Sequence, residues 1–188
     1  MLFFIADTHF GHKNVIKHDK RPFTFVEEMD QAIIDNWNKY VTPKDQVYFL
    51  GDWCYRSDEL TPPRTAEYYL KKLKGHISII FGNHDRRYAR RIADKFYGYS
   101  DFQEIKYEHQ KITLCHYALR TWPSSHHGSF HLHGHSHGNL APWGKSLDVG
   151  IMNKGWKPDT CWLYSFEEIK KFMEDKPVTL HHTDYEDY

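Results

Sequence analysis

Five short segments of this chain carry side chains of the types that bind metal ions in proteins. In chain order they are Asp7-Thr8-His9, Gly51-Asp52, Gly82-Asn83-His84-Asp85, Cys115-His116 and Gly134-His135-Ser136-His137. Carboxylate, amide and imidazole groups together suit divalent transition metals other than the thiolate-selective ones. Each segment alone also fits a turn or a capping pair, but their shared chemistry predicts a site that holds a pair of divalent cations.

An apolar run typical of a β-strand precedes each of these segments. We expect strands at 2–6, 46–50, 76–81, 111–116, 130–134 and 146–150, and another at 160–164. Ligands bind at the carboxyl ends of strands in open α/β sheets, so the five segments are expected to meet at that edge. Because side chains alternate between the two faces of a strand, Asp7 and His9 are predicted to point to the same side.

Helical patterns separate the strands in the first half of the chain, and the second half is mostly strand. This order indicates an α/β fold with a mixed sheet, or with two sheets packed face to face between helices. No repeat, low-complexity tract or linker divides residues 1–188, so a single domain is expected. Four helices are predicted. The first begins at a Thr24-Glu27 capping box, and the second begins at Pro62-Pro63 and ends at Gly75. The third runs from near Arg86 to Phe96, and the fourth begins at a Ser165-Glu168 capping box.

The overall charge is balanced, with 25 Lys and Arg against 25 Asp and Glu. This balance argues against a protein that wraps duplex nucleic acid or lies on an anionic membrane, so an anionic substrate has to be attracted locally. The basic stretch formed by Lys13, Lys17, Lys20 and Arg21 is expected to be a solvated face. No apolar stretch reaches the ~20 residues that span a bilayer, and the segment 1–6 is typical of a first strand and not of a signal peptide.

Cysteine usage bears on the compartment. The three cysteines are Cys54, Cys115 and Cys161. Their odd number and wide spacing argue against a disulfide framework and fit a reducing environment, so we predict a cytoplasmic protein with no membrane partner.

Histidine is abundant, with 15 in the chain, and many of these lie in the second half of the chain near the motif segments. His181 and His182 lie near an acidic C-terminal end and are expected to be solvated.

The order D-x-H, G-D, G-N-H-D, H and G-H-x-H is similar to that of the calcineurin-like metallophosphoesterase superfamily. The resemblance covers residues 1–150, is complete at every motif position, and is closest in type to the small bacterial and phage phosphoesterases. It implies a four-layer αββα sandwich, in which two mixed β-sheets are flanked by helices. It also implies a phosphoric ester hydrolase with two divalent transition-metal ions, for which we take manganese first by analogy, before iron or zinc.

The resemblance also implies roles for individual residues. Asp52 would bridge the two metals, and His84 would stay uncoordinated and face the substrate. A hydroxide shared by the metals would attack phosphorus, and His84 would assist the leaving group. The implied ligands are Asp7, His9, Asp52 and His137 for the first metal, and Asp52, Asn83, His116 and His135 for the second.

Further side chains are predicted to surround the reacting group. The predicted substrate-binding residues are Arg86, Arg87, Arg120 and His127. The first two follow the segment that contains His84, and the other two lie in a loop that is expected to rim the site. Asp85 is predicted either to orient His84 or to cap the following helix. Tyr117 and Trp122 are predicted either to stack on a base or sugar, or to pack beneath that loop.

The predicted function is therefore a dinuclear metal-dependent phosphoesterase that acts on a phosphodiester of a nucleotide or of an RNA or DNA end. A phosphomonoesterase is the alternative, because the same metal pair serves both reactions. A non-catalytic interaction scaffold of this fold would be expected to lack a ligand or His84, and all of them are present. A metal store would not need an uncoordinated histidine beside the ligands.

Overall fold

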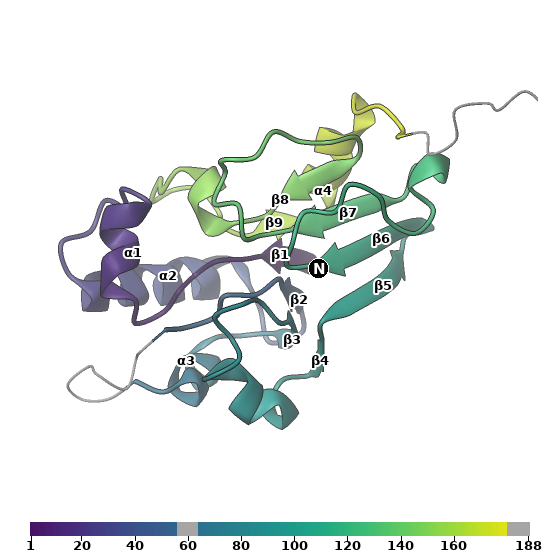
Figure 1. The fold of residues 1–188 in the computed structure, drawn as a ribbon. Helices are drawn as coiled ribbons and strands as arrows, with labels where there is room; N and C mark the ends of the chain where they lie inside the picture. Colours follow the sequence, from purple (N-terminus) through teal and green to yellow (C-terminus); the bar gives the residue numbers. More distant parts are fainter. Residues whose placement is uncertain (56–63, 180–188) are drawn as a thin grey trace, which may run out of the picture.

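The computed structural model describes residues 1–55 and 64–179, where two mixed β-sheets pack between helices (Figure 1). The first sheet contains β1 (Leu2–Ile5), β2 (Gln46–Phe49), β3 (His76–Ile80), β4 (Gly98–Ser100) and β9 (Tyr164–Ser165), and the second contains β5 (Phe102–Tyr107), β6 (Gln110–Cys115), β7 (Phe130–His133) and β8 (Ser146–Asp148). Their orders are β4-β3-β2-β1-β9 and β5-β6-β7-β8. β9 and β5 are antiparallel to their neighbours, and the other pairs are parallel.

Helices pack against both sheets. They are α1 (Lys13–His18), α2 (Val26–Tyr40), α3 (Ala66–Lys72) and α4 (Phe166–Glu174), with 3₁₀ helices η2 (Ala89–Lys95), η3 (Ser125–His127) and η4 (Ile151–Lys154). Trp37 of α2 and Tyr69 of α3 lie in an apolar core on one side of the first sheet. Ile169 of α4 lies in a second core, which is shared by both sheets. The predicted α/β sandwich of two mixed sheets flanked by helices is confirmed.

β1 is buried on both faces, and this explains its unbroken apolar sequence. Phe3 and Ile5 point into the first core, whereas Leu2 and Phe4 point into the second. The alternation of side chains along the strand thus divides four consecutive apolar residues between two cores. This burial fixes the position of the strand's carboxyl end, from which the first metal-ligand segment continues.

Two of the predicted helix starts differ from the structure. α2 begins one residue later than a Thr24 cap requires, and Phe25 occupies its N-cap position without a side-chain cap. Instead, the Thr24 backbone N–H donates to the Glu28 carboxylate, so the Thr24-Glu27 box is wrong. The helix predicted to begin at Pro62-Pro63, which lie outside the described residues, is α3, whose N-cap is Thr65.

The Ser165-Glu168 capping box is confirmed, with both of its reciprocal bonds present. The helix predicted near Arg86 is the shorter 3₁₀ helix η2, which is interrupted by non-helical backbone at Ile92. The strand predicted at 160–164 is only the two-residue β9, because a turn precedes it in which the Thr160 N–H donates to the Lys157 carbonyl. Strands β4 and β5 were not predicted.

Cys54, Cys115 and Cys161 form no disulfide in the described residues, and Cys54 and Cys115 are buried. Within the two described stretches, none of the helices is both long enough and apolar enough to cross a bilayer. His181 and His182 lie outside the described residues.

Candidate metal centre

Two overlapping groups of side chains lie at the carboxyl ends of strands from both sheets. Asp52 belongs to both groups. Within each group, one potential ligand atom of every residue lies within 4.8 Å of the others. The first group is Asp7, His9, Asp52 and His137, and the second is Asp52, His116 and His135.

Asn83 lies with the second group. Its Oδ1 atom is 3.0 Å from His116 Nε2 and 3.0 Å from His135 Nδ1. An amide oxygen can accept from an imidazole N–H or coordinate a cation together with it. The structure therefore brings all seven of the predicted ligands to one place, in two groups that share a carboxylate.

The backbone of this region turns sharply directly after each strand. Five of the seven residues have left-handed backbone, with φ of 59° at Asp7, 50° at His9, 60° at Asp52, 66° at His135 and 48° at His137. Left-handed backbone at non-glycine residues costs of order 1–3 kcal/mol each and clusters at functional sites. Asp7 and His9 point to the same group, as predicted. The reason is not alternation along a strand, because both residues follow the end of β1 and are not extended.

Glycines allow the backbone to approach the carboxylates. A Cβ atom at Gly82 would lie 2.4 Å from Asp52 Oδ1, and one at Gly134 would lie 2.8 Å from Asp7 Oδ2. Since real Cβ atoms do not approach other atoms this closely, a side chain at either position would displace a carboxylate of the centre. The glycines in two of the five segments are therefore required by packing against the candidate ligands.

Asp85 connects two of the turns, a role that neither sequence-based alternative foresaw. Its carboxylate is buried and accepts hydrogen bonds from the backbone N–H groups of Asp52 at 2.9 Å, Trp53 at 2.9 Å and Gly82 at 2.7 Å. Burial raises the pKa of this carboxyl to about 7, an effect that the three N–H donors oppose. Asp85 neither orients His84 nor caps η2, because its oxygens face the backbone.

Asp148 holds the turn that carries His135 and His137. One of its oxygens accepts from the Ser136 hydroxyl at 2.7 Å and from the Gly138 N–H at 2.9 Å. The other accepts from the Gly150 N–H at 2.8 Å. The turn from the second sheet is also joined to the first sheet, because the His135 N–H donates to Asp7 Oδ2 at 3.0 Å.

Burial determines the electrostatics of the ligand groups. It raises the pKa of the Asp7 carboxyl well above its usual value, and the nearby Asp52 carboxylate adds to this rise. It lowers the pKa of the His9 imidazole, to which Arg21 also contributes, and burial lowers the pKa of His116. Burial therefore favours the neutral form of the His9 and His116 imidazoles, which is the form that coordinates metals, and the carboxylates of Asp7 and Asp52 favour a bound cation.

The donor set fits divalent cations in a further respect. The Nε2 atoms of His9 and His137 lie 3.2 Å apart and face each other, and Asp52 Oδ2 is 3.5 Å from both His9 Nε2 and His116 Nε2. Buried nitrogens and oxygens that converge in this way need a proton or a cation among them. Mixed imidazole, carboxylate and amide ligands are suited to manganese, iron or zinc.

His84 lies beside both groups and belongs to neither. Its backbone N–H donates to Asp52 Oδ1 at 2.9 Å, while its Nε2 atom is 4.0 Å from Asp52 Oδ2. The side chain is 37% exposed, and its ring lies against those of His9 and Tyr55. A ring that is fixed on one side and open to solvent on the other can meet a molecule bound at the centre.

The predicted substrate-binding residues are dispersed. Arg120 is exposed and its guanidinium lies 4.8 Å from the Trp143 ring centre, in a pocket of about 250 Å³. Arg86 is exposed, whereas Arg87 lies against Tyr88 in a different pocket beside α3.

His127 lies away from the centre, contrary to expectation. It belongs to η3, which precedes the first residue of β7, and the neighbouring Gly128 carbonyl accepts from the Gln110 side chain at the start of β6. These are the amino ends of the two strands, so His127 is at the opposite end of the second sheet from the candidate ligands.

Aromatic residues near the centre separate into packed and exposed ones. Trp122 is buried and its indole N–H donates to the Ser129 carbonyl, so it packs beneath the loop. Tyr117 is exposed, and its ring lies against those of His116 and His135. Trp143 is also exposed and was not singled out from the sequence, because no motif surrounds it.

Two further residues at the centre were missed or misassigned. Asp19 was not singled out, and it accepts from His137 Nδ1 at 2.7 Å. Arg21 was expected on a solvated face, but it is buried and donates to the Asp7 and Thr8 carbonyls. No local pattern marks either residue, because Asp19 meets a partner 118 positions away in the chain.

Comparison with known proteins agrees with this geometry. An uncharacterized protein of Methanocaldococcus jannaschii is 35% identical over 184 residues, an alignment that covers 94% of this chain and 93% of that protein. The crystal structure of a protein of unknown function from Aquifex aeolicus has a similar fold, with a TM-score of 0.66 and 22% identity, over 92% of this chain and 98% of that one. The calcineurin-like phosphoesterase family matches residues 2–183. With its ligand segments brought together at the strand ends of two mixed sheets, this chain belongs to the calcineurin-like phosphoesterase family.

Proposed function

We propose that this protein is a dinuclear metal-dependent phosphoesterase, and that its substrate is a phosphodiester of a nucleotide or of a nucleic-acid end. The observation that carries the proposal is the pair of overlapping ligand groups that share Asp52, with His84 beside them and outside both. A phosphomonoesterase would use the same centre.

The ligands follow from this arrangement. The first cation would be held by Asp7, His9, Asp52 and His137, and the second by Asp52, Asn83, His116 and His135. Bound divalent metals supply a hydroxide nucleophile near neutral pH and neutralise charge on the phosphoryl oxygens. We propose manganese as the metal for assays, with iron and zinc as alternatives that the same ligands accommodate.

His84 would act on the leaving group. Its backbone is tied to Asp52, and its exposed ring places Nε2 beside the shared carboxylate without joining either ligand group. From that position, the imidazole can donate a proton or a hydrogen bond to the departing oxygen. A general acid of this kind typically contributes a factor of 10²–10⁴ to the rate.

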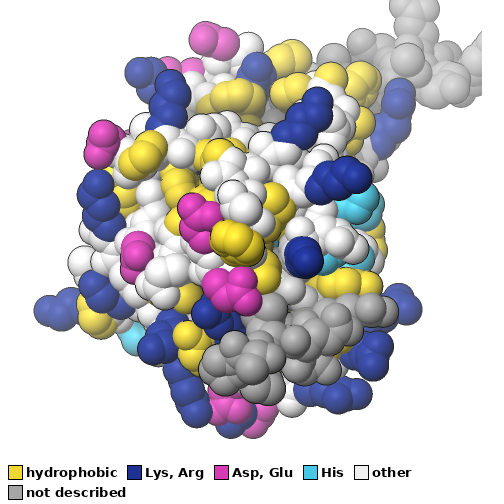
Figure 2. Space-filling model, turned by 90° about the vertical axis from the view of Figure 1, so that its left-hand side faces the viewer, with side chains coloured by type: hydrophobic (Ala, Val, Ile, Leu, Met, Phe, Trp, Pro, Cys, Tyr) yellow, Lys and Arg dark blue, Asp and Glu magenta, His cyan; other side chains and the backbone are white. Residues whose placement is uncertain are grey.

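The surface around the centre supports an anionic substrate with an aromatic part. Figure 2 views the molecule from the side on which β6, β7 and β8 end, and Lys and Arg side chains lie around much of its periphery. α1 adds the exposed Lys13 and Lys17. The exposed ring of Tyr117, which lies against those of His116 and His135, offers a surface on which a nucleobase can stack.

The test is a substrate panel combined with metal analysis. Protein purified without chelator should contain about two transition-metal equivalents per chain. With added Mn²⁺ it should hydrolyse bis-p-nitrophenyl phosphate and 2′,3′- or 3′,5′-cyclic nucleotides faster than p-nitrophenyl phosphate. Faster hydrolysis of the monoester would identify a phosphomonoesterase, and a folded protein that binds no metal and hydrolyses no ester would contradict the proposal.

A further inference from the structure

We infer that Arg21 and Asp19 form a brace that positions the ligands of the first cation site, and of that site specifically. This inference rests on the proposed function, because it concerns the cation held by Asp7, His9, Asp52 and His137. The brace consists of the Arg21 guanidinium and the Asp19 carboxylate, neither of which belongs to a ligand group. Both residues come from the end of α1 and the segment that follows it.

Asp19 determines how the His137 ring is oriented. Its Oδ1 atom lies 2.7 Å from His137 Nδ1. Because an ionised carboxylate only accepts hydrogen bonds, Nδ1 must carry the proton, and Nε2 then presents its lone pair. That Nε2 atom faces His9 Nε2 at 3.2 Å, inside the first ligand group. Partners that act in this way on metal-ligating histidines fix both the tautomer and the ring orientation.

Arg21 joins this carboxylate to the backbone of the Asp7 turn. Its Nε and Nη2 atoms donate to Asp19 Oδ2 at 3.1 and 2.8 Å. Nη2 also donates to the Asp7 carbonyl at 2.9 Å, and Nη1 donates to the Thr8 carbonyl at 2.8 Å. One planar guanidinium therefore connects the left-handed turn that carries Asp7 and His9 to the group that orients His137.

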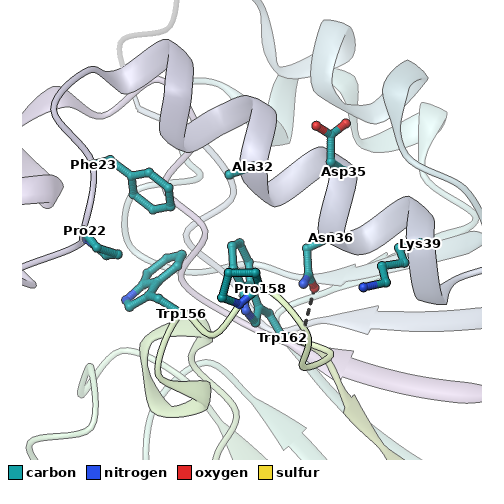
Figure 3. Close-up of a pocket in the computed structure, with 9 residues that line it drawn as sticks. All are labelled: Pro22, Phe23, Ala32, Asp35, Asn36, Lys39, Trp156, Pro158 and Trp162. Atoms are coloured by element: carbon teal, nitrogen blue, oxygen red, sulfur yellow. Dashed lines mark hydrogen bonds between the residues drawn. The ribbon is translucent and has the colours of Figure 1, made fainter.

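The brace is shielded from water. The Arg21 side chain is fully buried, and its guanidinium lies 5.2 Å from the centre of the Trp156 ring. Trp156 packs edge-on against Phe23 and Trp162, and the three rings line a pocket of about 470 Å³ beside α2 (Figure 3). Trp156 also has left-handed backbone, with φ of 53°, which is unusual for a bulky residue. The indole thus covers the guanidinium where it would otherwise meet solvent.

The brace contacts ligands of the first site directly and none of the residues that belong only to the second. Of the residues assigned to the second cation, His116 donates its Nδ1–H to the Leu50 carbonyl, and His135 contacts Asn83 and Tyr117. Among residues 1–55 and 64–179, neither Asp19 nor Arg21 forms a hydrogen bond or ion pair with these residues. Loss of the brace is therefore expected to weaken one cation and spare the other, whereas a general loss of stability would affect both.

The decisive experiment measures Mn²⁺ binding by calorimetry and the histidine tautomer by ¹⁵N NMR of metal-free protein. In Asp19→Ala, we expect the dissociation constant of one of two cations to rise 10–100-fold, as for other partners of ligating histidines. In Asp19→Asn, the dissociation constant of that cation should lie between the values for Asp19→Ala and for the unchanged protein, since an amide oxygen still accepts from His137 Nδ1. Arg21→Lys should resemble Asp19→Asn, because an ammonium cannot reproduce the guanidinium fork.

The control is Asp159→Ala, which removes an exposed carboxylate far from both ligand groups in sequence and should bind both cations normally. The ¹⁵N signals of His137 are assigned by their loss in His137→Gln. In the metal-free unchanged protein they should show that Nδ1 carries the proton. In Asp19→Ala the tautomer should shift toward the form with the proton on Nε2. If Asp19→Ala does not fold, Asp19→Asn and Arg21→Lys provide the same comparison.

The outcomes are separable from those of the proposed function. If the unchanged protein binds no metal, the proposed function fails, while the tautomer measurement still tests the brace. If the variants bind both cations with unchanged affinity, or weaken both equally, or leave the His137 tautomer unaltered, the brace is overturned even where the enzyme is active.

Discussion

At the scale of single residues, Asp52 and His84 contact each other but are expected to have separate tasks. The Asp52 carboxylate lies in both ligand groups, and its Oδ1 atom accepts the His84 backbone N–H. Its backbone N–H donates to Asp85, and its Oδ2 atom faces His9 and His116. The His84 ring is held beside this carboxylate and remains accessible.

Replacement of these two residues should therefore separate catalysis from metal binding. We expect His84→Ala to lower kcat by a factor of 10²–10⁴ on Mn²⁺-dependent ester hydrolysis while the metal content stays unchanged. Asp52→Asn should lose metal and activity together, because it removes a charge from both groups. Metal analysis and steady-state kinetics on the same preparations give the comparison.

His18→Ala is the matched control, since His18 is an exposed histidine at the end of α1. It should retain both metal and activity. A His84→Ala protein with full kcat on every hydrolysed ester would show that His84 has no part in the chemistry.

At the scale of elements, α2 is tied to the turn that follows the first ligand segment through a buried acid. Asp30 of α2 accepts from the Gly11 N–H at 3.0 Å and from the Tyr69 hydroxyl at 2.6 Å. Burial raises the pKa of Asp30 to about 6 from its usual 3.8, and the Tyr69 hydrogen bond opposes the rise. The ionised form is thus less stable in the folded protein than in the unfolded chain.

This predicts a pH-dependent contribution to stability with a defined sign. Between pH 3.8 and about 6, Asp30 binds more protons in the folded state than in the unfolded chain. The contribution of Asp30 to the free energy of unfolding is therefore fully present below pH 3.8 and is lost as the pH rises to about 6. A pKa difference of roughly 2 corresponds to about 3 kcal/mol. Asp30→Asn removes the titration, so its free energy of unfolding, relative to that of the unchanged protein, should rise by up to that amount as the pH rises across this interval.

Urea denaturation of both proteins at pH 4, 5, 6 and 7 measures the difference directly. Its pH dependence isolates Asp30, because the other carboxyl groups are common to both proteins. Parallel stability curves across this range would mean that Asp30 is ionised with an ordinary pKa in the folded state.

At the scale of the whole molecule, the candidate metal centre joins the two sheets. Asp7 and Asp52 follow strands of the first sheet, whereas His116, His135 and His137 follow strands of the second. The two sheets also share an apolar core, but at this edge the contacts between them are polar. Cations held there would link the sheets where packing alone does not.

We therefore expect metal binding to stabilise the folded protein as a whole. Each site should contribute about 2.7 kcal/mol at a free metal concentration 100 times its dissociation constant. Thermal unfolding in excess Mn²⁺ should occur at a higher temperature than in EDTA. Asp52→Asn should show little difference between the two conditions, and equal midpoints for the unchanged protein would contradict a centre that spans both sheets.

The elements that were predicted well are those whose signal is local. Ser165 and Glu168 are three residues apart and form the expected capping box, and the buried strands were found from their apolar runs. β5 was missed because its residues alternate between half-buried and exposed positions at the edge of a sheet. Thr24 was misplaced because the structure starts α2 one position later, where Glu28 and not Glu27 meets the Thr24 backbone.

By itself, the sequence determined the types of the candidate ligands, their positions after apolar strands and hence the family. These are properties of short segments, in which side-chain chemistry and strand periodicity can be read directly. Only the tertiary structure decided the roles of Asp19, Arg21 and Asp85, and the place of His127 at the far end of the sheet. Their roles depend on left-handed turns and on contacts such as Asp19–His137 and Asp85–Asp52, whose partners lie 118 and 33 positions apart, and no local pattern encodes these.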